Sequence, residues 1–132
     1  MTVTGSGVDV VELARLKRSL ERGGAAFDVR VFTAAEQRRA EAASNPLAHR
    51  AALFASKEAC FKAIGMPWDA GFDWLDLEVD PGWPALRPPS VRFTGPVASW
   101  MEGSRLLLAI GATRRHVTAV AIRLASHPPG TY

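Results

Sequence analysis

The sequence has one cysteine, Cys60, and no apolar run that approaches the roughly 18 residues of a membrane-spanning helix. A single cysteine excludes a disulfide framework within the chain, which favours the reducing cytoplasm. The first residues also lack the charged start and the apolar stretch that are typical of a secretory signal. We therefore expect a cytoplasmic protein that does not span a membrane.

The sequence also lacks a lysine-rich arm and any RNA-binding signature, so it does not favour nucleic acid as a partner. Its formal net charge is nevertheless +3. Such mild basicity favours acidic partners, either phosphate groups or an acidic protein. The 132 residues are 48% hydrophobic and 22% charged, which is typical of one soluble globular domain.

Signals for helices gather in the first half of the chain. A short buried strand is expected at residues 8–11, and it should lead into a helix that the glycines at residues 23–24 end. The capping-box spacing of residues 33–36 predicts the start of a second helix. A third helix should begin at Pro46, because proline is favoured at the first helical position, and should end near Gly65.

Signals for strands gather in the second half of the chain. Four strands are expected there, at residues 74–79, 91–93, 106–110 and 117–124. The last two are joined by a charged turn and should form a hairpin, and a short helix should precede them at residues 96–102. Helices early and strands late predict an α+β fold, with helices packed on a mainly antiparallel sheet. The single domain should cover residues 1–125, and residues 126–132 should form a disordered tail.

Three charged side chains interrupt the apolar third helix. At about 100° per residue, Lys57 projects from the middle of an apolar stripe, and Glu58 and Lys62 lie together on its flank. Lys57 could snorkel to water, and the other two could form an exposed helix ion pair. Alternatively, the stripe borders a cleft in which Glu58 faces a metal and both lysines face phosphate oxygens. A lysine centred on an apolar face is costly unless an anion meets it.

Asp9 is a second candidate acid, because it stands inside the apolar strand segment of residues 7–11. An acid in such a strand must be capped, paired or bound to a metal. Capping of the helix that follows is the common alternative without a functional role. Together, Asp9 and Glu58 would supply two hard oxygen ligands, which suits a Mg²⁺ completed by water and substrate phosphates.

The segments GVDVVELARL (7–16), RVFTAAE (30–36) and FASKEACFKAIG (54–65) resemble the holo-acyl-carrier-protein synthases. These are short, single-domain 4′-phosphopantetheinyl transferases, and the resemblance extends to about residue 124. It implies the fold of that family. It also implies that coenzyme A donates its phosphopantetheine arm to a serine of an acyl carrier protein and releases 3′,5′-ADP, in fatty acid or polyketide biosynthesis.

The resemblance assigns roles to the charged residues of the strand and the third helix. Asp9 and Glu58 would hold Mg²⁺ against the pyrophosphate. Lys57 and Lys62 would contact phosphate oxygens and, with Glu58, would form the catalytic set. Neutralised charge and in-line positioning would then supply most of the rate, as in other phosphoryl transfers.

The resemblance also implies contacts outside this set. Gly65 would contact the coenzyme, and Arg15 and Arg30 would meet the acidic carrier protein. Family members of this length are usually homotrimers with active sites between subunits, so residues of a neighbouring chain would complete the site.

The chain departs from the family in three places, and each departure removes a polar group. Residues 109–112 (AIGA) replace a Ser-x-Ser/Thr-His strand end that helps to hold the coenzyme. Leu53 replaces an arginine, and residues 65–67 (GMP) replace a Gly-Thr-Gly loop. Each hydrogen bond to a charged group is worth about 1.5–3 kcal/mol, so these losses would weaken coenzyme binding. His116, next to an Arg-Arg pair, is either a partial substitute or an ordinary turn residue.

These departures leave two alternatives to the transferase open. The chain could be a family paralogue that performs different chemistry on a small apolar substrate, as in natural-product biosynthesis, because a fold does not fix a function. The same acids and lysines would then act as acid and base groups. It could also be a non-catalytic scaffold that binds carrier protein.

Overall fold

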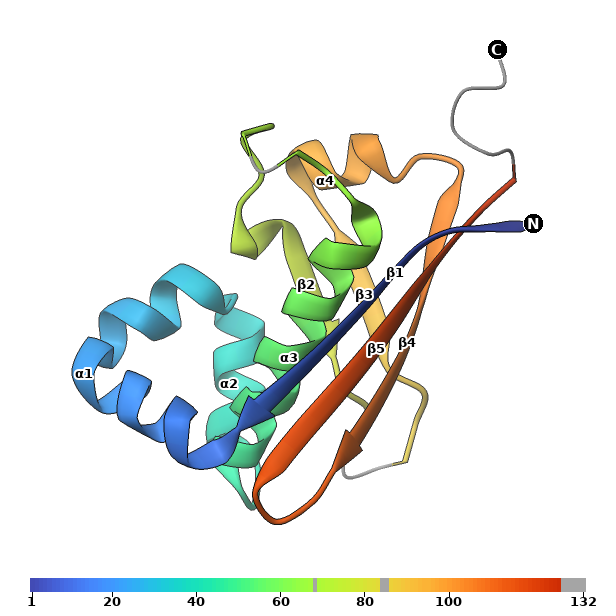
Figure 1. Cartoon of the computed structure of the whole chain (residues 1–132). Coiled ribbons are helices and arrows are strands. Elements are labelled where there is room, and N and C mark those ends of the chain that lie inside the picture. The colour runs from blue at the N-terminus through green and yellow to red at the C-terminus, as the bar shows by residue number, and fades with distance from the viewer. Residues whose placement is uncertain (68, 84–85, 127–132) are drawn as a thin grey trace.

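The computed structural model describes residues 1–67, 69–83 and 86–126. In chain order its elements are β1 (Thr2–Glu12), α1 (Leu13–Val31), α2 (Ala34–Ala42), α3 (Pro46–Ile64), the 3-10 helix η1 (Trp74–Asp76), β2 (Leu77–Asp80), β3 (Ser90–Phe93), α4 (Gly95–Trp100), β4 (Ser104–Ala112) and β5 (His116–Ala125). These elements confirm the predicted α+β fold (Figure 1). Of the predicted tail, only Ser126 lies within the described residues.

A three-stranded antiparallel sheet of order β1-β5-β4 forms one layer, and α3 packs across it (Figure 1). The strands β4 and β5 form the predicted hairpin. A second antiparallel pair, β2 with β3, lies beside α3. Within the described ranges, none of the helices combines the length and apolar character needed to cross a membrane.

The helix α3 lies very close to β1, because glycines face it there. A Cβ atom on Gly7 would overlap the carbonyl oxygen of Ala59, and one on Gly5 would overlap that of Ala63. Small alanines of α3 also fill the buried layer between the helix and the sheet. This close approach sets the next inward-facing residue of β1, Asp9, beside the middle of α3.

The capping signals of the second and third helices are confirmed. The side chain of Thr33 accepts a hydrogen bond from the backbone of Glu36, whose own side chain accepts one from the backbone of Thr33. Pro46 occupies the first turn of α3, and Gly65 ends it in the left-handed conformation. The predicted strand at residues 74–79 is wrong in its first part, since residues 74–76 form a 3-10 turn whose backbone Asp73 caps.

The prediction that the first helix ends at residues 23–24 is confirmed in part, since the backbone angles of Gly24 are not helical, but a further helical segment follows. The helix kinks at Gly24, which has a φ of 53°, and then continues to Val31. Glycine adopts this conformation without steric cost. Beyond the kink, Phe27 and Val31 pack against the core, so burial of these side chains favours the extra helical turns.

His49 in α3 is buried, and its Nε2 atom has no hydrogen-bond partner among the described residues. Burial lowers the pKa of this imidazole below its usual 6.5, and the nearby Arg39 and Arg50 lower it further. The unfolded chain therefore binds a proton more readily than the folded chain as the pH falls below 6.5, and folding stability decreases.

We expect the variant His49→Leu to lose less stability between pH 7 and pH 5 than the wild-type protein does. Urea unfolding at pH 7, 6 and 5 measures this difference. Equal losses in the wild type and in His49→Leu would contradict the expectation.

Candidate functional site

A cavity of about 530 Å³ opens where the end of β1 meets the start of α1 and the middle of α3. Asp9 of β1 and Glu58 of α3 both line it, and we call it the acid cavity. The structure therefore brings together the two acids that the sequence predicts to meet. Both are partly exposed, so the acids can reach a ligand in solution.

The two carboxyl groups of the acid cavity are close enough to affect each other's charge. Burial raises the pKa of Glu58, the negative charge of Asp9 raises it further, and the positive charge of Lys62 opposes both. Two carboxylates that repel each other across an open cavity favour the binding of a cation between them.

Lys62 reaches from α3 to β1 and lies beside Asp9. Its Nζ atom donates a hydrogen bond of 2.8 Å to the carbonyl oxygen of Val8 and lies 3.5 Å from Oδ1 of Asp9. The alternative of a helix ion pair between Glu58 and Lys62 is wrong for this structure, since the amine pairs with Asp9 instead. The side chain remains half exposed, so its amine is free to contact a ligand.

Lys57 does not face the acid cavity. Its side chain is fully buried, and Nζ lies 2.7 Å from Oε1 of Glu36, 2.7 Å from the carbonyl oxygen of Val31 and 3.1 Å from that of Trp74. Burial lowers the pKa of this amine, while the carboxylate of Glu36 opposes the effect. All three ammonium donors are used inside the protein. This geometry corrects the expected phosphate contact of Lys57, and it also contradicts the snorkelling alternative.

Glu36 was missed as the anion that meets Lys57. Its Oε2 atom also accepts a hydrogen bond of 2.8 Å from the backbone of Val79 in β2, in addition to its role in the capping box of α2. The buried pair thus ties α2, β2 and the end of α1 to α3. The available signals were the cost of an unpaired lysine on an apolar face and the presence of a second acid in a capping box.

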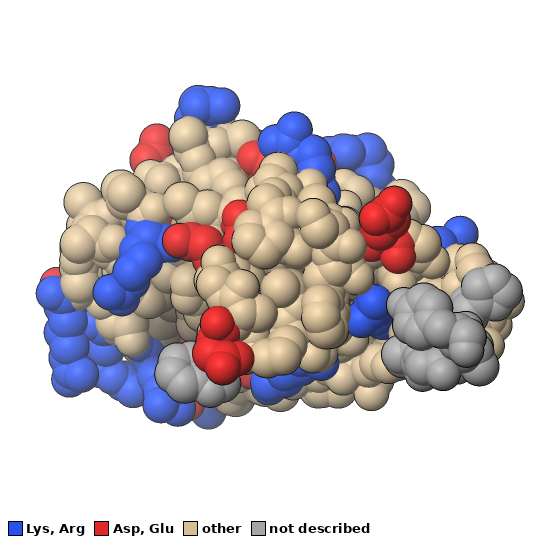
Figure 2. Space-filling model, turned by 90° about the horizontal axis from the view of Figure 1, so that it is seen from above, with Lys and Arg blue, Asp and Glu red and all other residues tan. Residues whose placement is uncertain are grey.

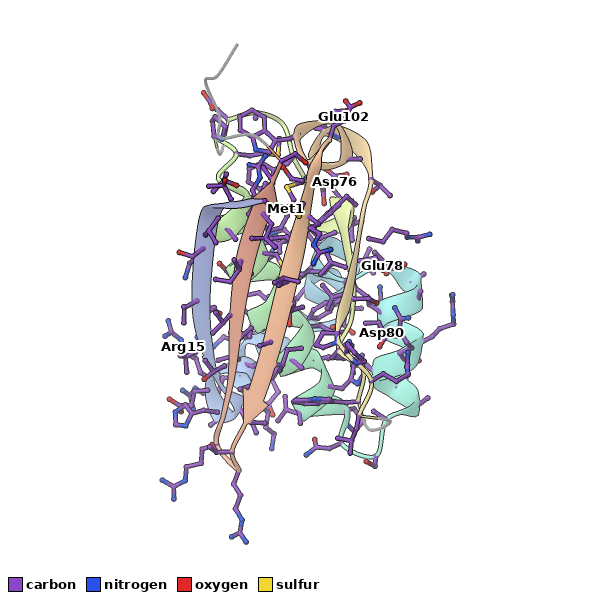
Figure 3. All side chains as sticks on the ribbon, turned by 90° about the vertical axis from the view of Figure 1, so that its right-hand side faces the viewer. Met1, Arg15, Asp76, Glu78, Asp80 and Glu102 are labelled. Atoms are coloured by element: carbon purple, nitrogen blue, oxygen red, sulfur yellow. The ribbon has the colours of Figure 1, made fainter. Side chains whose placement is uncertain are left out.

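The remaining predicted site residues fall into three places. His116 and Arg15 line the acid cavity, and Figure 3 shows the labelled Arg15 beside the end of β1. Gly65 lies outside the acid cavity and lines a separate one of about 760 Å³ together with Lys62. Arg30 is exposed on α1. The structure therefore gathers His116 and Arg15 around the two acids, but not Gly65.

Two aromatic side chains form an apolar wall of the acid cavity. Phe27 and Phe54 line it, with their ring centroids 5.9 Å apart. The ring of Trp74 stacks on that of Phe54, with the ring centroids 5.5 Å apart. Trp74 therefore supports the apolar wall. The role of Phe27 was not predicted, because it lies beyond the expected end of the first helix.

Leu53, where the resembled family has an arginine, is fully buried in this chain. It packs with Val31, Phe32 and Val79 in a second core cluster. Position 53 therefore faces the core here and supplies no group to the acid cavity, which is consistent with an apolar side chain at this place.

The donor set of the acid cavity fits a partly hydrated divalent cation. Within residues 1–67, 69–83 and 86–126, no three His, Cys, Asp or Glu side chains come together in a group able to enclose a metal ion. Asp9 and Glu58 supply two carboxylates on a cavity that is open to solvent. Such a pair suits Mg²⁺, which usually keeps several waters and takes further oxygens from substrate phosphates.

This arrangement defines an α+β protein in which a helix packed across an antiparallel sheet sets two acids in one open cavity. The family model of the 4′-phosphopantetheinyl transferase superfamily (ACPS) matches residues 5–121. The chain therefore belongs to this superfamily of transferases.

Curated relatives match almost the whole chain. A holo-[acyl-carrier-protein] synthase of Koribacter versatilis (strain Ellin345) is 36% identical over 125 residues, which are 91% of this chain and 97% of the relative. One of Methylobacterium radiotolerans is 38% identical over 127 residues, which are 96% of this chain and 87% of the relative.

Solved structures agree with this assignment. The holo-[acyl-carrier-protein] synthase of Neisseria meningitidis is similar with a TM-score of 0.81 and 29% identity, covering 93% of this chain and 99% of that chain. An ACPS–CoA complex from Chronobacterium ammoniagenes is similar with a TM-score of 0.79 and 26% identity, covering 96% of this chain and all of that chain.

Proposed function

We propose that this protein transfers the 4′-phosphopantetheine group of coenzyme A to a serine of an acyl carrier protein in the cytoplasm, with Mg²⁺ as cofactor. The observation that carries the proposal is the meeting of Asp9 and Glu58 in one open cavity beside Arg15. The names of the curated relatives and the coenzyme complex of a similar structure support the choice of substrates.

The residues of the acid cavity have separate roles in the proposed transfer. Asp9 and Glu58 would hold the cation, whose charge would neutralise the phosphate charge during in-line attack by the serine. Lys62 stands beside Asp9 with an exposed amine and donates hydrogen bonds to phosphate oxygens. Phe27 and Phe54 form the apolar wall and exclude water from one side of the reacting groups.

The carrier protein, an acidic partner, would dock on the side of the molecule formed by α1. Arg15 and Arg30 are exposed on this helix. Figure 2 shows basic side chains gathered at its left margin, the side on which Figure 1 draws α1. Complementary charge of this kind speeds encounter and orients a partner. Arg15 stands at the rim of the acid cavity, so a partner held there would present its serine to Asp9 and Glu58.

The uncovered face of the three-stranded sheet supports the proposal of a homotrimer. Val8, Val10, Leu107 and Val120 are 52%, 56%, 46% and 37% exposed. Figure 3 is seen from the side of this sheet, with its strands in front and α3 behind them. Val8 and Val120 are register neighbours, so the exposed apolar side chains are adjacent on this face. An apolar face of this kind favours burial against another copy of the chain.

We expect the wild-type protein to sediment as a trimer and the variant Val10→Lys to shift toward the monomer. A charge on the apolar face would be costly to bury between subunits. The matched control is Val29→Lys, which places the same charge on an exposed valine of α1 and should remain trimeric. A monomeric wild type at micromolar concentrations would contradict the trimer.

Mass spectrometry of an apo acyl carrier protein, incubated with this protein, coenzyme A and Mg²⁺, tests the proposed function. We expect the carrier to gain the mass of one phosphopantetheine group. An unchanged mass across carriers of fatty acid and polyketide synthesis would contradict the proposal, provided that the wild-type protein is folded in the same buffer.

A second candidate function is different chemistry on a small apolar substrate. It is favoured by a cavity of about 390 Å³ at the altered strand end, where Ala112 lies with Trp83 and Leu86. Failure to bind coenzyme A in calorimetry would favour this candidate over the transferase.

A further inference from the structure

A second cavity, of about 470 Å³, adjoins the acid cavity at the tip of the β4–β5 hairpin. Arg114, Arg115 and His116 line it, together with the β1–α1 junction, and we call it the hairpin cavity. Glu12 and His116 line both cavities. The two cavities therefore lie next to each other and meet at these two residues.

The hairpin tip is held in place by its own hydrogen bonds. The hydroxyl oxygen of Thr113 accepts hydrogen bonds from the backbone of Arg115 and of His116, at 3.3 and 3.1 Å. The backbone of Leu13 donates one of 2.9 Å to the carbonyl oxygen of Arg115. The backbone of the turn is thus attached to the start of α1.

The two guanidinium groups are exposed and available to a ligand. Arg114 and Arg115 are both exposed, and no described carboxylate lies within salt-bridge distance of either one. Glu12 is exposed in the same cavity, and two arginines leave a positive charge there after that acid is counted. Guanidinium groups bind phosphate through paired, charge-assisted hydrogen bonds.

The proposed donor carries phosphate at two places. Coenzyme A has a diphosphate, one phosphate of which is transferred with the pantetheine arm, and a separate phosphate on the 3′ position of its ribose. The acids of the acid cavity can meet the diphosphate through a shared cation, but they would repel a second phosphate. Residues 109–112 (AIGA), which lead into the hairpin tip, offer no side-chain donor. Arg114 and Arg115, which follow these residues, do offer side-chain donors.

We propose that Arg114 and Arg115, with His116, bind the 3′-phosphate of coenzyme A, and that this contact makes the protein select coenzyme A over 3′-dephospho-coenzyme A. The inference rests on the proposed function for the identity of the donor. The turn would then bind the 3′-phosphate in place of residues 109–112, which have no polar side chains in this chain.

Calorimetric titration of the full-length protein with coenzyme A and with 3′-dephospho-coenzyme A, both with Mg²⁺, tests the inference. We expect Arg114→Gln/Arg115→Gln to weaken the binding of coenzyme A by about 10- to 100-fold, as expected for the loss of charge-assisted hydrogen bonds. Its affinity for 3′-dephospho-coenzyme A should stay unchanged, which also shows that the variant is folded. The control Arg92→Gln/Arg105→Gln removes the same charge from exposed arginines of β3 and β4 and should keep the wild-type preference.

Several outcomes separate this inference from the proposed function. If the wild type transfers phosphopantetheine but the double variant keeps the wild-type preference for the 3′-phosphate, the inference is wrong and the function stands. The inference is also wrong, and the function stands, if the double variant raises only the KM for the carrier protein. The arginines would then contact the carrier instead of the coenzyme. If the wild type binds neither coenzyme, the proposed function and the inference both fail.

Discussion

Replacing Lys57 with methionine should lower the free energy of unfolding by about 3–5 kcal/mol, because the carboxylate of Glu36 would remain buried without its cation. The two side chains are fully buried and their charged atoms are 2.7 Å apart. Loss of the amine would also leave the carbonyl oxygens of Val31 and Trp74 without its hydrogen bonds. Urea unfolding of Lys57→Met at pH 7 measures the effect.

The double variant Lys57→Met/Glu36→Gln distinguishes the contribution of the ion pair to stability from that of the packing around it. Removing both charges avoids an uncompensated buried ion, and such replacements are often close to neutral. A glutamine has one carbonyl oxygen, so it keeps an acceptor for only one of the two backbone donors, that of Thr33 or that of Val79. We therefore expect the double variant to be more stable than Lys57→Met alone. A cost below about 1 kcal/mol for the single variant would contradict a buried ion pair at this position.

The variant Glu58→Gln should reduce transfer to the carrier protein by about 100-fold or more, since it removes one of the two charges that hold the cation. The change keeps the shape of the side chain. It also removes the repulsion between Glu58 and Asp9, which raises the pKa of Glu58, so the variant should unfold at no lower urea concentration than the wild type. Initial rates from mass spectrometry of the carrier, with unfolding curves of the same samples, measure both quantities.

Glu41→Gln is the matched control, because Glu41 is an exposed glutamate of α2. It should retain the wild-type rate. If Glu58→Gln instead kept a rate within a few-fold of the wild type, Glu58 could not hold a catalytic cation. The transfer reaction would then have to rely on other residues.

The sequence predicts the parts of this structure that depend on local signals. Capping residues placed the starts of α2 and α3 correctly, and alternating apolar residues located the β4–β5 hairpin. The meeting of Asp9 with Glu58 could also be expected, since a polar side chain within an apolar segment is costly without a partner. The capping and hairpin predictions use properties of neighbouring residues only.

The features that sequence reasoning missed depend on contacts between distant segments. Gly24 interrupts the first helix as expected, but the helical segment beyond it, in which Phe27 and Val31 pack against the core, was not predicted. Lys57 was assigned to phosphate because its anion was unknown. The acid that meets it, Glu36, lies on another helix and serves at the same time in a capping box. Charge and periodicity show that such a lysine needs a partner, but only the packing of α2 against α3 identifies it.

Titration with Mn²⁺, observed by electron paramagnetic resonance in the presence of coenzyme A, tests most directly whether Asp9 and Glu58 share one divalent cation. We predict one Mn²⁺ bound per chain in the wild-type protein, competition by Mg²⁺, and loss of this binding in both Asp9→Asn and Glu58→Gln. Wild-type binding in both variants would contradict the shared cation, and so would the absence of any bound Mn²⁺ in the folded wild-type protein.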